Sequence, residues 1–125
     1  MVIGIGMDVV ETSRVAQALA RSGSRFSDRV YSPAELAECT GRADRIAALS
    51  GRFAAKEACL KALGTGFRGM SLRHVEVVRG QGGGSPVLSL SGRAAAEAER
   101  RGVRRLHLSL THQGGVAAAV VILEG

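Results

Sequence analysis

The chain has 125 residues and a mass of 13.0 kDa, a length typical of a single domain that buries a real core. Hydrophobic residues make up 46% of it and aromatic residues only 3%, and no apolar run reaches the ~20 residues of a membrane span. Seventeen basic against eleven acidic residues give a net charge of +6, which favours an anionic partner such as a nucleic acid, a nucleotide or an acidic protein.

The N-terminal half predicts one strand followed by helices. Residues 2–7 predict a short buried strand that ends at Asp8, and its two glycines let another backbone approach closely. An apolar stripe over residues 11–21 predicts a helix, and Ser32-Pro33-Ala34-Glu35 has the pattern of a capping box that opens a short helix. A longer helix is predicted from about Asp44 to Leu63, ended by Gly64 and Gly66.

Strands dominate the C-terminal half. Residues 71–79 and 86–91 predict two strands joined by a glycine-rich turn, and a helix follows to Arg101. Residues 104–111 alternate between leucines and polar residues, whereas 116–123 are apolar throughout, so the last strand is predicted to be central. The order strand, helices, two strands, helix, two strands predicts a compact α+β fold in one domain, residues 1–125.

The only two lysines of the chain, Lys56 and Lys61, flank Glu57 on the long helix. Glu57 and Lys61 are one turn apart and fit an ordinary surface ion pair. Glu57 also borders the core-facing stripe, where a charge is costly without a partner, and a metal ion is one such partner. Lys56 is predicted at the opposite border of that stripe. The stripe itself is narrow and consists of Ile46, Leu49, Phe53 and Leu60.

Asp8 is the natural companion of Glu57 in a metal site. Two carboxylates, phosphate oxygens and waters suit Mg²⁺, and Lys61 beside them would neutralise phosphate charge. Taken alone, Asp8 also fits a turn residue at a strand end, and His112, before two glycines, fits a hydrogen-bonded structural residue. The chain has neither a complete GxGxxG fingerprint nor a Walker A pattern, and no spacing supports covalent catalysis.

Three sequence blocks together resemble the holo-acyl-carrier-protein synthases, the small 4′-phosphopantetheinyl transferases. The blocks are GIGMDVVETSR, GRFAAKEACLKALGTG and HLSLTHQGGVAAAVVILE, and the segments FSDRVYSPAE and GSPVLSLSG fit as well. They occur in the family's order and cover nearly the whole chain. The resemblance implies Mg²⁺-dependent transfer of the phosphopantetheine arm of coenzyme A to a serine of apo acyl carrier protein, with release of adenosine 3′,5′-bisphosphate.

The resemblance also implies roles for individual residues. Asp8 and Glu57 match the metal-binding acids, and both belong with Lys61 to the catalytic set. The set expected to bind coenzyme A is Lys61, Gly64, Arg52, Pro86 and His112, and the set expected to dock the carrier protein is Arg14, Arg21 and Arg25. Because small members of the family form trimers with sites between subunits, Gly64, Pro86 and His112 are expected to reach the site from a different subunit than Asp8.

Several assignments stay open at this level. Glu57, directly or through a bound water, is the first choice to accept the proton of the serine, and water alone is the competitor. Lys56 fits either a phosphate of the coenzyme or an acid such as Glu76. Gln113 stands where some relatives have an acid linked to catalysis, which puts a role for that position in doubt. Val10 stands where larger relatives have a second acid, so two protein metal ligands are expected.

Two other classes of protein explain the sequence less well. A nucleic-acid-binding domain fits the pI of about 10.6, but three Phe and one Tyr give no stacking platform, and no known DNA-binding motif is visible. A carrier-protein-binding module without catalysis needs neither the two acids nor Lys61.

The N-terminus lacks the features of a signal peptide, and Cys39 and Cys59 form no CxxC pair, so we expect a cytoplasmic protein. The sequence leaves open whether a fatty-acid or a polyketide carrier is modified.

Overall fold

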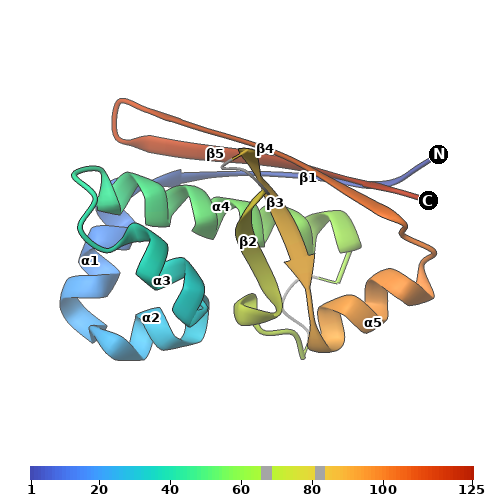
Figure 1. The fold of residues 1–125 in the computed structure, drawn as a ribbon, viewed down its shortest axis with the longest axis horizontal. Helices are drawn as coiled ribbons and strands as arrows, with labels where there is room; N and C mark the ends of the chain where they lie inside the picture. The colour runs from blue at the N-terminus through green and yellow to red at the C-terminus, as the bar shows by residue number, and fades with distance from the viewer. Residues whose placement is uncertain (66–68, 81–83) are drawn as a thin grey trace.

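A computed structural model describes residues 1–65, 69–80 and 84–125 of the chain. It confirms the mixed α+β architecture and the predicted order of elements (Figure 1). The elements are β1 Val2–Glu11, α1 Thr12–Ser22, α2 Ser24–Val30, α3 Pro33–Cys39, α4 Arg45–Leu63, a 3₁₀ turn η1 Leu72–His74, β2 Val75–Gly80, β3 Gly84–Leu90, α5 Gly92–Arg100, β4 Arg105–Gln113 and β5 Val116–Glu124.

A three-stranded antiparallel sheet and helix α4 form the centre of the molecule. The strand order is β1-β5-β4, so the apolar last strand is central, as predicted. Helix α4 lies along one face of this sheet, and the β2–β3 hairpin crosses the other side of the helix (Figure 1). Helices α1 to α3 gather near the start of α4, and α5 lies near its end (Figure 1). The core therefore lies on both sides of α4.

The two glycines of β1 allow the strand to lie directly against α4. A Cβ atom at Gly6 would stand 2.0 Å from the carbonyl oxygen of Ala58, and one at Gly4 would stand 2.2 Å from that of Ala62. Any larger residue would force the helix and the strand apart. The prediction that another backbone approaches these glycines is confirmed. The close approach also fixes Asp8, two residues further along β1, beside the last turns of the helix.

The prediction that α4 has only a narrow apolar stripe was wrong. The helix is buried on most of its circumference because a sheet covers one side and the hairpin and shorter helices cover the other. Alanines fill the positions where neighbours come closest: Ala48, Ala54, Ala55, Ala58 and Ala62. Lys56, predicted at a border of the stripe, is fully buried.

Other boundaries also differ from the predictions. Helix α2 was missed because seven residues show too little periodicity to indicate a helix. Strand β1 continues past Asp8 to Glu11, and β4 continues through His112 to Gln113, because both strands stay paired with β5 over that length. Gly64 ends α4 in the left-handed conformation as predicted, whereas Gly66 and residues 81–83 of the predicted turn lie outside the described residues.

The face of the three-stranded sheet that points away from α4 is apolar and open. Ile5, Met7 and Val9 of β1 are 65%, 62% and 56% exposed on it. Val120 pairs with Met7 on one side and Ser109 on the other, so the apolar surface continues from β1 onto the central strand. Within the described residues, no helix is long and apolar enough to cross a membrane.

Candidate active site

An acidic centre lies where β1 crosses the last turns of α4. The Lys61 ammonium group donates hydrogen bonds to Asp8 Oδ1 at 2.9 Å and to the Met7 carbonyl oxygen at 3.1 Å. The predicted surface pair of Glu57 with Lys61 is therefore wrong, since Lys61 pairs with an acid 53 residues away. Asp8 is mostly buried and Lys61 is more than half exposed, so a ligand in solution can reach the lysine side chain.

Glu57 shares a cavity with Asp8. Burial raises the pKa of the Glu57 carboxyl, and the negative charge of Asp8 raises that pKa further, while Lys61 and Arg14 oppose the shift. Two carboxylates are thus held close together in partly desolvated surroundings, where they repel each other. The cavity has an apolar wall as well, which consists of Val10, Val15, Ala18, Phe26 and Phe53.

The donor set of this centre fits Mg²⁺. Among residues 1–65, 69–80 and 84–125, no group of three or more His, Cys, Asp or Glu side chains could hold a metal ion. Mg²⁺ does not need such a group, because it keeps several waters and commonly takes one or two carboxylates together with phosphate oxygens of a substrate. A divalent cation bound between Asp8 and Glu57 would relieve the mutual repulsion of the two carboxylates.

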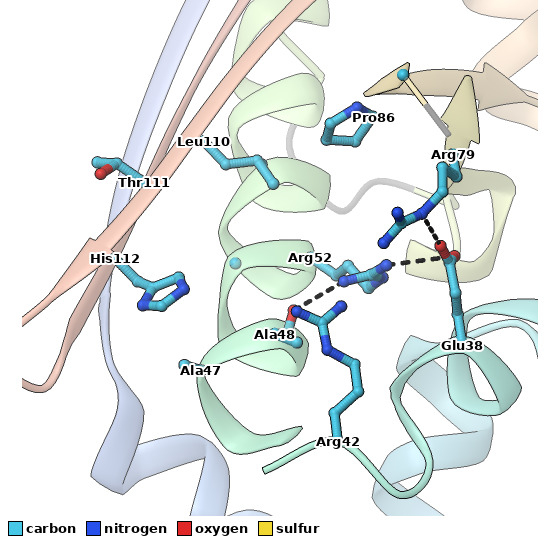
Figure 2. A pocket seen from close by; sticks show the side chains of 12 residues that line it. Glu38, Arg42, Ala47, Ala48, Arg52, Arg79, Pro86, Leu110, Thr111 and His112 are labelled. Carbon is cyan, nitrogen blue, oxygen red and sulfur yellow. Dashed lines mark hydrogen bonds and ion pairs between the residues drawn. The ribbon is translucent and has the colours of Figure 1, made fainter. Parts of the chain in front are cut away.

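A second cavity of about 250 Å³ lies near the start of α4 and is strongly basic (Figure 2). Arg42, Arg52, Arg79 and His112 point toward it from four separate segments of the chain (Figure 2). Its remaining wall includes Pro86 of β3 and Thr111 of β4. We call this cavity the basic pocket. Its volume is below the roughly 300–1,000 Å³ of typical ligand sites, so it suits one part of a larger ligand.

One acid organises the arginines of the basic pocket. Glu38 accepts a hydrogen bond from Arg79 Nε at 2.8 Å, and its other oxygen lies 3.3 Å from Arg52 Nη2 (Figure 2). Arg52 is only 7% exposed, and within the described part of the chain its Nε has no hydrogen-bond partner. Arg42 instead donates two hydrogen bonds to Asp44. A buried guanidinium with an unused donor favours an anionic ligand, because the unmet hydrogen bond is otherwise costly.

The structure divides the predicted coenzyme-binding residues among three places. Arg52, Pro86 and His112 meet in the basic pocket. Lys61 belongs to the acidic centre and lies nine residues after Arg52 on α4, which places it on the opposite side of the helix. Gly64 lines a further cavity beside α5. A single chain thus carries an acidic centre and a basic pocket that it does not bring together.

Of the three residues predicted to dock the carrier protein, Arg14 lies at the acidic centre. Arg14 on α1 lines the cavity of Asp8 and Glu57. Arg21 and Arg25 are exposed, but Arg25 belongs to α2 and not to the first helix, because Gly23 separates the two helices. Their role in docking stays a prediction.

Sequence reasoning missed the partner of Lys56 and half of the basic pocket. Lys56 pairs with Glu35, at 2.6 Å, and not with Glu76 or a ligand. The capping-box pattern predicted that Glu35 caps a helix, but it did not predict that Glu35 also pairs with Lys56. For Arg79 and Glu38 there was no local signal, because their elements are distant in sequence and meet only through the fold.

Comparisons with known proteins identify the family and the fold of this chain. Residues 4–121 match the family model of the 4′-phosphopantetheinyl transferase superfamily. The holo-[acyl-carrier-protein] synthase of Anaeromyxobacter dehalogenans (strain 2CP-1) is 51% identical over 100% of this chain and 98% of that protein. The crystal structure of the Neisseria meningitidis enzyme of this name superimposes with a TM-score of 0.90 at 32% identity and covers 100% of both chains. That of Helicobacter pylori, solved in complex with coenzyme A, gives a TM-score of 0.81 at 30% identity over 96% of this chain and 99% of that one. The chain belongs to the 4′-phosphopantetheinyl transferase superfamily, among the holo-[acyl-carrier-protein] synthases.

Proposed function

We propose that this protein transfers the 4′-phosphopantetheine arm of coenzyme A to a serine of an apo acyl carrier protein and releases adenosine 3′,5′-bisphosphate. The observation that carries the proposal is the presence, on one chain, of an acidic centre with a lysine and a basic pocket with a buried, partly unpartnered arginine. A transfer from a coenzyme with a diphosphate and a 3′-phosphate needs both kinds of site. The carrier protein supplies the hydroxyl that attacks, so the chain needs no nucleophile of its own.

In this proposal Asp8 and Glu57 hold Mg²⁺. The metal ion supplies charge neutralisation at the diphosphate when it is bound. Lys61 then leaves Asp8 and contacts a phosphate oxygen, where its ammonium group stabilises the charge that develops on the leaving bisphosphate. Glu57 accepts the proton of the serine, directly or through a water, because it lines the cavity beside Asp8.

The basic pocket is proposed to bind a phosphate of the adenosine half of the coenzyme. Arg52 offers its guanidinium group, and Arg79 and His112 add positive charge and hydrogen-bond donors around it. Pro86 offers an apolar surface at the rim for the adenine base. Gly64 lines a separate cavity beside α5. Its predicted contact with the coenzyme therefore requires that Gly64 and the basic pocket come from different copies of the chain.

We also propose that the active site is completed between copies of the chain in a homotrimer. The acidic centre and the basic pocket lie on opposite sides of α4, so one coenzyme joins them only if the pocket of one copy faces the acidic centre of another. The open apolar face of the sheet provides a surface for this association, because such a face is otherwise costly in water. We place the enzyme in the cytoplasm, where its product would serve fatty-acid synthesis or a polyketide pathway.

Incubating an apo acyl carrier protein with this protein, coenzyme A and Mg²⁺ should add one phosphopantetheine arm, a mass gain of about 340 Da. Intact-protein mass spectrometry measures the gain, and EDTA should abolish it because, without the cation, the two carboxylates repel the diphosphate. Fatty-acid and polyketide carriers are tested in parallel, and a carrier with its acceptor serine replaced by alanine is the control. If neither carrier gains mass, the interpretation as a docking module takes precedence over the proposed function.

Replacing Ile5 by Lys should convert the trimer to monomers. Ile5 is 65% exposed in one chain, so a lysine there costs little unless a second copy covers it. Size-exclusion chromatography with light scattering measures the mass of each species. Val87→Lys, at a position of β3 that is 45% exposed, is the matched control and should leave the mass unchanged. A wild-type protein that elutes as a monomer at micromolar concentration would contradict the proposal.

A further inference from the structure

Beneath the basic pocket lies a fully buried ion pair. Lys56 on α4 and Glu35 on α3 both have exposed fractions of 0%, and their charged atoms are 2.6 Å apart. The ammonium group also donates to the carbonyl oxygens of Val75 at 2.6 Å and Leu72 at 3.1 Å. All three of its donors are thus used inside the protein. Lys56 therefore has none left for a ligand.

Glu35 is equally well satisfied. One oxygen accepts a hydrogen bond from the Ser32 amide, and the other accepts one from the Val77 amide, both at 2.8 Å. The pair therefore joins α3, α4, the turn η1 and strand β2 at a single point. An apolar pair of similar volume is often as stable as a buried ion pair, so stability alone gives no reason for this arrangement.

The buried pair and the basic pocket are built on the same three elements. Glu38, Arg52 and Arg79 meet in the pocket, where the acid bridges the two arginines (Figure 2). Arg52 and Glu38 each lie one helical turn from a side chain of the buried network, on the same side of their helices. Arg79 lies two residues after Val77, whose backbone amide belongs to the network. The three relations are Lys56 with Arg52 on α4, Glu35 with Glu38 on α3, and Val77 with Arg79 on β2.

We propose that Lys56 is a positioning residue for coenzyme binding. Its ion pair with Glu35 holds α3 and β2 at a fixed distance from α4, and this spacing keeps the guanidinium of Arg52 beside Glu38 and Arg79 in the wall of the basic pocket. The inference rests on the proposed function, since it takes the coenzyme phosphate as the ligand of the pocket. The acidic centre depends on the contact of β1 with α4 instead, so the network acts on binding and not on the transfer step.

Lys56→Met tests this role because Met fills similar space without charge. We expect the Kd for adenosine 3′,5′-bisphosphate, measured by calorimetry, to rise by about tenfold, as for the loss of a well-placed charged hydrogen bond. The KM for coenzyme A should rise in parallel, while kcat stays within about twofold because the acidic centre is intact. Val121→Ala, which removes buried volume from β5, is the control for a loss of stability without a loss of positioning.

A second variant keeps the test decisive if Lys56→Met folds poorly. The double variant Lys56→Met/Glu35→Met replaces the whole pair by apolar side chains and should regain stability while still binding the bisphosphate weakly. Wild-type affinity in either variant would overturn the inference. If the wild-type protein itself binds neither coenzyme A nor the bisphosphate, that result contradicts the proposed function and, with it, the inference that rests on it. Weak binding by Val121→Ala would show that the effect is one of stability, and would also overturn the inference.

Discussion

Glu57→Gln is expected to lower kcat by about 10²- to 10⁴-fold at saturating Mg²⁺ and coenzyme A, the range for loss of a general base. Glutamine keeps the size of the side chain and one possible metal-facing oxygen, but it cannot take up the serine proton. The reason to choose Glu57 over Asp8 is its position: Glu57 lines the cavity, whereas Asp8 is held as the ion-pair partner of Lys61.

Single-turnover kinetics of arm transfer provide the measurement, and metal binding is titrated separately so that a weakened Mg²⁺ site is not mistaken for a lost base. Glu99→Gln, on the exposed side of α5, is the control and should leave the rate unchanged. Near-normal turnover of Glu57→Gln with the metal site saturated would remove Glu57 as the base and leave water as the acceptor of the proton.

The parts of the fold that the sequence predicted correctly depend on local patterns. Uniform apolarity indicated that residues 116–123 form a central strand, and the structure places β5 between β1 and β4. The capping box at Ser32 and Glu35 forms as its spacing predicts, with hydrogen bonds in both directions. The glycines of β1 were interpreted as a close backbone contact, and α4 makes that contact. Each of these features is signalled by a pattern within one short segment of the chain.

The parts that the sequence could not predict are decided by the packing of distant elements. The helical wheel placed Lys56 at the edge of a stripe, because it takes no account of the hairpin and of α3, which enclose the other side of α4. The basic pocket combines side chains from α3, α4, β2 and β4, and no motif indicated that Glu38 and Arg79 would join Arg52 and His112 there. The clustering of both lysines around Glu57 thus has two explanations: Lys61 faces the acidic centre, and Lys56 faces the core.

Glu35→Ala should destabilise the protein by about 3–5 kcal/mol, the usual cost of leaving one member of a buried ion pair without its partner. Lys56 would then keep two carbonyl contacts but lose the only carboxylate that its ammonium group touches in the described structure. Asp44→Ala, which removes the acid of the more exposed ion pair with Arg42, is the control. Because that pair is in contact with water, this change should leave the stability nearly unchanged.

The destabilisation of Glu35→Ala should shrink as the pH rises. Burial lowers the pKa of Lys56, and Glu35 is the largest influence opposing that shift, so its removal lowers the pKa further. Between this folded-state pKa and the ordinary lysine value, the unfolded chain binds more protons than the folded one, and stability therefore increases with pH. Urea unfolding at about pH 6 and about pH 9.5 should show a smaller difference between variant and wild type at the higher pH. A difference that stays constant over this range would mean that Lys56 does not carry the buried charge on which the ion pair depends.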